Sequence, residues 1–297
     1  MCDLSVIGSD SGGITAIVTA YKRIEQSIET IGRILRCTPP PQEILVHVDG
    51  NQIACADAIK AAFPSIRVFL SAQNIGPGGG RNRLLANARC TYVASFDDDS
   101  YPLCGDYFQR IVKVFERYPK ASVLAASIFH RGEFPPATAN STCAWIATFV
   151  GAGCVYRRPA FVKTTGYVPL AVAYGMEEVD LSLRILDSGG GILLVPSLQV
   201  FHDTDRSHHA DPTITAFSIA NIALLAFLRY PVVFWPIGIA QLARRLIWLL
   251  RARRFKGIVE GLLIIPGHLY RYKHYRATVS AKSLCRLLSL GRRPRPV

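Results

Sequence analysis

Residues 92–99 read YVASFDDD, and this stretch decides the expected fold. Its first five residues suit a short buried strand, and the three carboxylates that follow end it. Similar apolar runs occur earlier in the chain, at residues 14–19 (ITAIVT), 43–48 (EILVHV) and 66–70. The sequence therefore predicts four short strands within the first hundred residues.

Helical segments are expected between these strands. The apolar spacing over residues 24–36 predicts an amphipathic helix, and residues 53–63 and 81–89 are also predicted to be helical. Strands that alternate with helices are typical of a Rossmann-like, mostly parallel α/β sheet flanked by helices. Because ligands bind beyond the carboxyl ends of such strands, we expect a site where residues 19–22, 49–51 and 97–99 meet.

The composition of the 297 residues divides the chain into unequal parts. Half of the residues are hydrophobic and 19% are charged, which excludes a disordered chain or a coiled coil. The net charge of +13 lies entirely in residues 212–297, where 15 Lys and Arg accompany the single acid Glu260. We expect a disordered leader at 1–13, a catalytic domain at 14–211 and a helical, basic and apolar extension at 212–297.

The spacing of the eight cysteines does not indicate a structural metal site, and the N-terminus does not indicate a secretory signal peptide. No pair of cysteines has C-x-x-C spacing, so a zinc site is not expected. The opening residues, MCDL, have neither a basic segment nor a long apolar segment, so we expect no signal peptide. Free thiols in a reducing cytosol are the simplest interpretation.

The acidic triplet at 97–99 is the strongest single motif. Adjacent carboxylates repel one another, and this arrangement is costly unless a cation is bound. Oxygen ligands at a sheet edge suit Mg²⁺ or Mn²⁺, and alternate residues of an extended segment point the same way, so Asp97 and Asp99 would face one ligand. The alternative is a solvated acidic turn that caps a helix.

An ordered set of segments resembles family 2 of the inverting glycosyltransferases, which have the GT-A nucleotide-sugar-binding fold. The resemblance covers about two thirds of the chain, from Ile14 to His202. It rests on these segments in the family's order: ITAIVTAYKR, VHVDGN, NIGPGGGRN at 74–82, FDDD, GAGCVYRRPAF at 151–161, YGMEEVDLSLR at 174–184 and VFH at 200–202.

The resemblance implies a binding site for the sugar-nucleotide donor. Tyr21 would stack on the base, with packing in the core as the alternative. Arg81 would bring its charge to the diphosphate, and Gly78-Gly79-Gly80 would form a loop that approaches the ligand closely. The donor-binding residues implied are Thr19, Ala20, Tyr21, Asp49, Asn74, Gly76, Arg81, Asp97 and Asp98.

The resemblance also implies a metal site and a catalytic base. Asp99 would be the main ligand of Mn²⁺ or Mg²⁺, completed by Asp97 and His202, although a lone histidine is more often a plain strand-end residue. Glu178 would be the base, with Glu177 and Asp180 beside it on the same helix. The alternative for these acids is a helix N-terminus that favours negative charge, with Arg184 as an internal salt-bridge partner.

The expected activity is transfer of one sugar from a nucleotide-diphosphate sugar to an acceptor hydroxyl, with inversion. The acceptor would be a saccharide or lipid-linked saccharide of cell-envelope or polysaccharide synthesis. Two alternatives remain, a sugar-nucleotide pyrophosphorylase and a non-catalytic membrane scaffold. A pyrophosphorylase normally has a glycine-rich loop after the first strand, whereas residues 20–23 here contain no glycine.

The C-terminal extension predicts contact with a membrane rather than with nucleic acid. Its apolar stretches at 212–228 and 230–240 are interrupted by Arg229, Pro231 and Pro236, which makes a spanning helix marginal. Interfacial helices with Trp, Phe and Arg fit better, facing the anionic lipid of the inner leaflet. We therefore expect a cytoplasmic protein attached peripherally to the inner face of the cell membrane. The alternatives are a soluble helical subdomain and a nucleic-acid-binding tail.

Overall fold

The computed structural model describes residues 13–135, 142–204 and 211–297. Most of the expected leader lies outside these residues. The first part of the chain contains β1 (Ile14–Ala20), α1 (Ile24–Leu35), β2 (Glu43–Val48), α2 (Ile53–Ala62), β3 (Arg67–Leu70), α3 (Gly76–Asn87), β4 (Tyr92–Asp97), β5 (Ser100–Pro102), α4 (Tyr107–Arg117) and β6 (Ala121–Phe129). The second part contains β7 (Ala144–Ile146), η1 (Gly151–Gly153), β8 (Cys154–Arg157), α5 (Arg158–Val162), α6 (Glu177–Asp187), β9 (Gly191–His202), α7 (Pro212–Arg229), η3 (Val232–Phe234), α8 (Trp235–Arg251), α9 (Ile258–Tyr272), η4 (Lys273–Tyr275), α10 (Ala281–Arg292) and β10 (Arg295–Pro296).

One central sheet organises the molecule. Its strand order is β10-β7-β9-β6-β8-β4-β1-β2-β3, and β5 pairs with β9. The half formed by β4, β1, β2 and β3 is parallel throughout, and β8 joins it to the β6–β9 pair in antiparallel fashion. In this register Thr19 pairs with Asp97 on one side and His47 on the other, so three strands end together at one edge.

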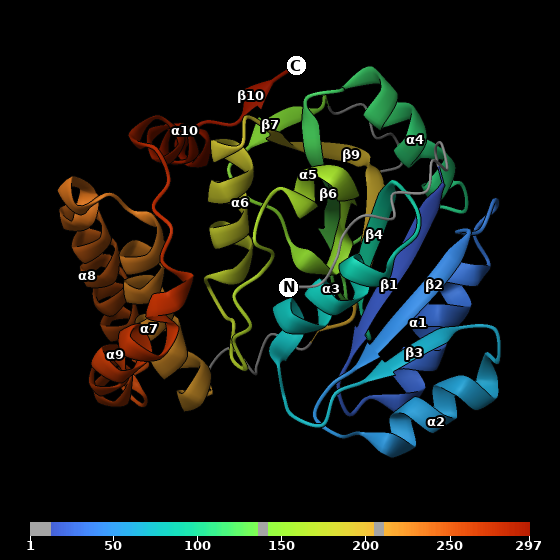
Figure 1. Cartoon of the computed structure of the whole chain (residues 1–297), viewed down its shortest axis with the longest axis horizontal. Helices are drawn as coiled ribbons and strands as arrows, with labels where there is room; N and C mark the ends of the chain where they lie inside the picture. Colours follow the sequence, from blue (N-terminus) through green and yellow to red (C-terminus); the bar gives the residue numbers. More distant parts are fainter. Residues whose placement is uncertain (1–12, 136–141, 205–210) are drawn as a thin grey trace.

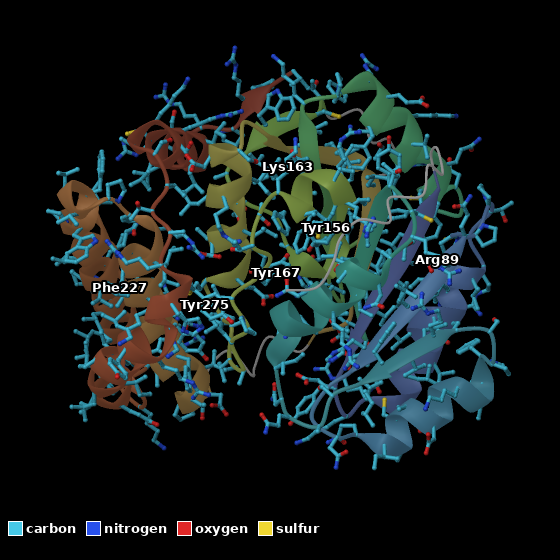
Figure 2. All side chains as sticks on the ribbon, viewed as in Figure 1. Arg89, Tyr156, Lys163, Tyr167, Phe227 and Tyr275 are labelled. Carbon is cyan, nitrogen blue, oxygen red and sulfur yellow. The ribbon has the colours of Figure 1, made fainter. Side chains whose placement is uncertain are left out.

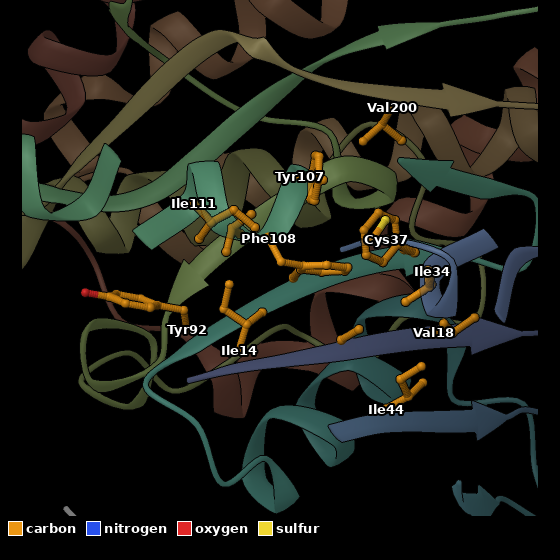
Figure 3. Close-up of a cluster of buried hydrophobic side chains, with 14 of the residues drawn as sticks. Ile14, Val18, Ile34, Cys37, Ile44, Tyr92, Tyr107, Phe108, Ile111 and Val200 are labelled. Atoms are coloured by element: carbon orange, nitrogen blue, oxygen red, sulfur yellow. The ribbon is translucent and has the colours of Figure 1, made fainter. Parts of the chain in front are cut away.

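Alternate residues of the strands feed two cores on opposite faces of the sheet. On one face, Val18 and Val46 pack with apolar residues of α1, α2 and α4, and Figure 3 shows part of this cluster around Tyr107 and Phe108. On the other face, Ile17 and Leu45 pack with apolar residues of α3, α5 and α6. The helix–sheet–helix sandwich confirms the expected α/β fold with a C-terminal helical extension.

The C-terminal helices lie beside the sandwich and are joined to it by α6 (Figure 1). A third core contains Leu183 and Leu186 of α6, Leu224 and Leu228 of α7, and residues of α10. After α10, the short strand β10 pairs with β7, which returns the chain to the central sheet. The helices that follow residue 211 begin with α7 at Pro212, and the end of the chain pairs with the central sheet.

Two local predictions were wrong. The glycine-rich segment expected to be a loop is the first turn of α3, because Gly78, Gly79 and Gly80 pack closely against other parts of the protein. An added Cβ would lie 2.9 Å from Tyr167, 2.9 Å from Ile75 and 2.6 Å from His47, respectively. The apolar runs at 192–195 and 198–201 predict two short strands, but they lie in the single strand β9. Its register against β6 shifts between Ala121 and Val123 and again between Ala126 and Ser127, and the second shift lies opposite the segment that contains Pro196.

Candidate active site

A pocket with a volume of about 540 Å³ lies at the carboxyl ends of β1, β2 and β4. The polar strand ends predicted from the sequence meet there, joined by the start of α6 and the end of β9. Residues from distant parts of the chain complete its wall. The lining includes Thr19, Ala20, Tyr21, Arg23, Asp49, Asn74, Gly76, Asp97, Asp98, Asp99, residues 171–175, Glu177, Glu178, His202 and Ile214.

Asp49 builds the wall of the pocket through hydrogen bonds. Its carboxylate accepts from the backbone N–H groups of Gly50 (3.0 Å), Ile75 (3.0 Å) and Gly76 (2.9 Å) and from the hydroxyl of Ser71 (2.7 Å). Asn74 adds a second acceptor to the Gly76 N–H at 2.9 Å. These bonds fix the turn before α3, so Asp49 and Asn74 shape the site.

Tyr21 offers an aromatic face at the pocket. Its side chain is 41% exposed, and its backbone N–H donates to Asp98 Oδ2 at 3.0 Å. Gly50, at φ +65°, lies beneath the ring, where an added Cβ would approach the ring within 3.0 Å. An exposed ring held at one place in a pocket provides a surface on which a flat base can stack.

The three aspartates point in different directions. Asp97 accepts from Thr19 Oγ1 at 2.9 Å and from the guanidinium of Arg81. Asp98 and Asp99 turn instead to the guanidinium of Arg23, and Asp99 Oδ1 lies 3.2 Å from His202 Nε2. Asp99 and His202 therefore come together as expected, whereas Asp97 is held on the other side by Arg81.

The charges of the triplet are set by burial and by these partners. Burial raises the pKa of Asp98 to about 7, and the neighbouring carboxylate of Asp99 adds to the shift. Burial also acts on Asp99, but its contacts with His202 and Arg23 outweigh it and lower its pKa. Burial opposes protonation of His202, yet Asp99 raises the pKa of this imidazole above its ordinary value.

This corner suits a cation by its chemistry. Two buried carboxylates and an imidazole surround one positively charged group, the guanidinium of Arg23. Carboxylate oxygen and imidazole nitrogen are ligands that Mn²⁺ accepts. Within the described part of the chain no three His, Cys, Asp or Glu side chains are already arranged to hold a metal ion. A metal ion at this corner would therefore replace Arg23.

Arg81 lies behind the pocket, where it joins the two groups of acids. It is 1% exposed, and its guanidinium contacts Asp97, Glu177 Oε1 at 2.8 Å and Ser95 Oγ at 3.1 Å. The buried acids raise its pKa despite the opposing effect of burial. The structure thus gives Arg81 a positioning role between the strand end and α6, instead of the predicted place beside a diphosphate.

Glu177 and Glu178 begin α6 at the pocket in different surroundings. Glu177 is 6% exposed and held by Arg81, whereas Glu178 is half-buried and accepts from the Gly151 N–H at 3.3 Å. Burial raises the pKa of both carboxyls. Of the two, Glu178 is the carboxyl more available to a bound molecule.

Asp180 does not line the pocket, in contrast to its expected place in the reaction centre. Its side chain is fully buried between the guanidinium groups of Arg184, on the same helix, and Arg229, at the end of α7. Asp180 therefore fastens α7 to the helix that carries Glu177 and Glu178. The sequence-based alternative of Arg184 as a salt-bridge partner is what the structure shows.

Two parts of the pocket were missed by sequence reasoning. Arg23 belongs to the segment ITAIVTAYKR, and its charge two residues after Tyr21 was an available signal. Residues 171–173 gave none, because they are apolar and lie just before the segment at 174–184 that carries Glu177 and Glu178. Asn221 of α7 holds this loop, with its Nδ2 donating to the carbonyls of Val172 and Tyr174 at 3.0 Å each.

A sheet whose strand-end acids face a second acidic pair across one pocket is the arrangement of a GT-A glycosyltransferase. The family model for glycosyl transferase family 2 matches residues 15–163, half of the chain. The protein belongs to this family, and it is a glycosyltransferase with the GT-A fold.

Solved structures with low sequence identity share this fold. The mannosyltransferase PcManGT from Pyrobaculum calidifontis, in complex with GDP-Man and Mn²⁺, is 16% identical with a TM-score of 0.58, over 95% of this chain and 80% of that one. S. aureus TarS 1–349, in complex with UDP-GlcNAc, is 15% identical with a TM-score of 0.62, over 89% and 82%. GalNAc-T7 with UDP, GalNAc and Mn²⁺ is 14% identical with a TM-score of 0.57, over 75% and 49%. A search of curated proteins found no match.

Proposed function

We propose that the protein transfers a single sugar from a nucleotide-diphosphate sugar to an acceptor hydroxyl, with inversion at the anomeric carbon. The observation that carries this proposal is the meeting of two acidic groups at one pocket. Asp97, Asp98 and Asp99 come from the end of β4, and Glu177 and Glu178 come from the start of α6. One group suits a donor with its cation, and the other suits proton removal from an acceptor.

The donor occupies the side of the pocket formed by β1, β2 and β4. The exposed ring of Tyr21 stacks on the nucleobase, between the wall that Asp49 organises and the strand end. Asp98 and Asp99 lie toward the diphosphate. Asp99 and His202 are the residues that would hold Mn²⁺ or Mg²⁺, and such an ion would stabilise negative charge on the departing diphosphate.

Glu178 removes the proton of the acceptor hydroxyl as its oxygen attacks the anomeric carbon. The C–O bond to the diphosphate breaks as the new glycosidic bond forms on the opposite face, which inverts the configuration. A raised pKa brings this carboxyl closer to neutral pH, where a general base works best. Glu177 is committed to Arg81 and keeps the base in place through the start of α6.

The acceptor enters along residues 171–175 and Ile214. This wall is apolar and has backbone groups of glycine and alanine, which suits the flat face of a sugar. Because Ile214 belongs to α7, the acceptor side of the pocket is continuous with the C-terminal helices. This continuity favours an acceptor of cell-envelope or polysaccharide synthesis, as a saccharide or a lipid-linked saccharide.

The C-terminal helices would attach the enzyme to the inner face of the cell membrane. Pro212–Arg229 and Val232–Arg251 are long and apolar enough to cross a membrane by length and composition, but 61% of the first is buried within the protein. Only 11% of the second is buried, and Ile239, Ile247 and Leu250 on it are at least half exposed. Arg244 and Arg251 are exposed on the same helix and suit anionic lipid, so α8 lies in the interface instead of spanning it.

A donor screen tests the proposed activity. Purified protein with Mn²⁺ is incubated with a panel of sugar nucleotides and saccharide acceptors, and transfer is followed by mass spectrometry. We expect transfer from one donor, with kcat lowered about 100-fold or more in Glu178→Gln and Asp99→Asn. Glu29 forms an exposed ion pair with Arg33 on α1. Glu29→Gln is therefore the matched control and should retain full activity. Undiminished transfer in Glu178→Gln would refute the assignment of the base.

Flotation tests the membrane attachment with the full-length chain. Wild-type protein should float with vesicles of phosphatidylglycerol. It should stay at the bottom of the gradient when the vesicles are made of phosphatidylcholine. The double change Ile247→Gln and Leu250→Gln should reduce flotation, since both residues lie on the exposed face of α8. Ile53→Gln changes an equally exposed residue of α2 and serves as the control. Equal flotation of all three proteins would rule out attachment through α8.

A further inference from the structure

A second cavity lies among the C-terminal helices, apart from the candidate active site. Its volume is about 180 Å³, roughly six times the share of one water molecule in the liquid. Ala223 and Phe227 of α7, Trp235, Ile239 and Leu242 of α8, and Leu269 of α9 line it, and every lining residue is apolar. Figure 2 places Phe227 in this group of helices, well away from Tyr156 and Tyr167. Such an apolar groove favours apolar occupants, because burying its surface removes that surface from water.

The guanidinium of Arg276 packs on two of the rings that line this groove. The guanidinium of Arg276 lies over the rings of Phe227 and Trp235, with its carbon 4.8 Å and 5.5 Å from their centroids. Its Nη1 is buried and has no hydrogen-bond partner in the structure. A buried guanidinium N–H without an acceptor is costly, and an anionic oxygen beside it would remove that cost.

The surroundings of the groove favour an anionic occupant. Residues 212–297 contain 15 Lys and Arg but a single acid, Glu260. This part of the chain therefore has no acidic segment of its own that would occupy the place beside Arg276. The mouth of the groove is open, since Ile239 is 67% and Trp235 37% exposed. A ligand would therefore need an alkyl chain for the groove and an acidic head at its end.

We propose that this groove binds one alkyl chain of an anionic membrane lipid, with the lipid phosphate beside Arg276. The exposed apolar face of α8 brings the mouth of the groove to the lipid surface, from which a single chain can enter. Binding in the groove adds a stoichiometric lipid contact to the non-specific attraction of a basic surface. The site involves no residue of the sugar-transfer pocket, so it holds or fails independently of the proposed activity.

Calorimetry with octyl phosphate, used as a monomer, tests the site on the full-length protein. We expect one octyl phosphate per chain, bound about tenfold more tightly than either inorganic phosphate or octanol. Ala223→Phe fills the groove and should weaken binding about tenfold, whereas Ala240→Phe adds the same ring at an exposed position of α8 outside the groove. Arg276→Gln should weaken octyl phosphate but not octanol, and exposed Arg292→Gln should change neither.

Several results would overturn the proposal. Inorganic phosphate that binds as tightly as octyl phosphate would indicate an adventitious anion site alone. Equal affinity in Ala223→Phe and Ala240→Phe would exclude the groove, and unchanged affinity in Arg276→Gln would exclude the phosphate position. Thermal unfolding checks that Ala223→Phe folds; if it does not, Ile239→Asn at the exposed mouth takes its place with the same expected loss.

Vesicles separate a membrane lipid from a soluble phosphate. Phosphatidylglycerol with brominated acyl chains should quench the fluorescence of Trp235, and the quenched fraction should fall in Trp235→Phe and in Ala223→Phe. Quenching that is the same in Ala223→Phe and Ala240→Phe would show that the chains reach Trp235 from the bulk membrane only, which overturns the lipid assignment.

Discussion

The guanidinium of Arg23 balances the negative charge of two carboxylates that lie side by side in a buried corner. Arg23 stands immediately before α1, and its guanidinium contacts both Asp98 and Asp99. Half of its side chain is exposed, so it can leave this position without unfolding any element. A divalent ion at Asp99 has to compete with this internal cation.

Removing Arg23 should therefore tighten metal binding. In the absence of nucleotide, we expect Arg23→Gln to bind Mn²⁺ about tenfold more tightly than the wild type, because the competing charge is gone. Titration calorimetry gives the affinity directly, without reference to turnover. Arg36→Gln, an exposed residue at the end of the same helix, should leave the affinity unchanged. Weaker binding in Arg23→Gln would mean that Arg23 helps the metal instead of competing with it.

At the scale of elements, α6 owes its position to a buried cluster of three charges. Asp180 accepts from Arg184 and Arg229, and Arg229 also donates to the carbonyl oxygens of Tyr275 at 2.7 Å and Ala277 at 3.2 Å. The cluster joins the helix of the proposed base, the end of α7 and the segment before α10. A change in the cluster should therefore reach the active site through α6.

Asp180→Asn should reduce the free energy of unfolding by about 3 kcal/mol, because two buried guanidinium groups lose their shared counter-charge. The kcat of transfer should fall with the displaced start of α6, while the affinity for the donor changes little. Denaturant unfolding and steady-state kinetics measure these effects. Asp57→Asn, an exposed acid of α2, is the control. The double change Asp180→Asn and Arg229→Met should recover part of the lost stability, and no recovery would argue against charge as the cause.

Some helices and strands could be predicted from the sequence, and others could not. Strands β1, β2 and β4 were predictable because their apolar runs end in polar residues, and strand ends of a parallel sheet meet at one edge. The start of α3 could not be predicted, because a run of glycines indicates a loop when only the sequence is known. The reason for these glycines is the neighbours that leave no room for a Cβ, such as His47 beside Gly80. Residues 171–175 are held at the site by Asn221 of α7, a contact between distant segments that no local pattern encodes. Arg23 offered a charge close to Tyr21 in sequence, but its contacts with Asp98 and Asp99 depend on the fold.

At the scale of the molecule, the C-terminal helices support the active site from behind. Asn221 of α7 holds the carbonyls of Val172 and Tyr174 on one side, and its Oδ1 lies 2.9 Å from Nε2 of His268 in α9. The wall of the pocket is thus connected to two helices of the proposed membrane-facing region. In this chain of hydrogen bonds, Asn221 Oδ1 accepts from Nε2–H of His268, and it is burial that disfavours a charged ring at this place.

Acid should weaken this support through His268. Its ring is 7% exposed and packs against Tyr272, and burial lowers its pKa from 6.5 to about 4. The unfolded chain takes up this proton at a higher pH than the folded protein does. The stability that neutral His268 confers is therefore complete above pH 6.5 and is lost as the pH falls toward and below 4, by about 3 kcal/mol in all.

The prediction is best measured as a difference between variants, because other groups titrate in the same range. Burial raises the pKa of Asp98, which makes protonation of that carboxyl favour the folded state as the pH falls. His268→Gln retains an amide N–H for Asn221 and has no charge at any pH, so its free energy of unfolding should fall less between pH 6.5 and 4.5 than that of the wild type. His274→Gln, at an exposed ring, should follow the wild type. Denaturant titrations across this range that gave parallel curves for wild type and His268→Gln would show that His268 does not couple folding to pH.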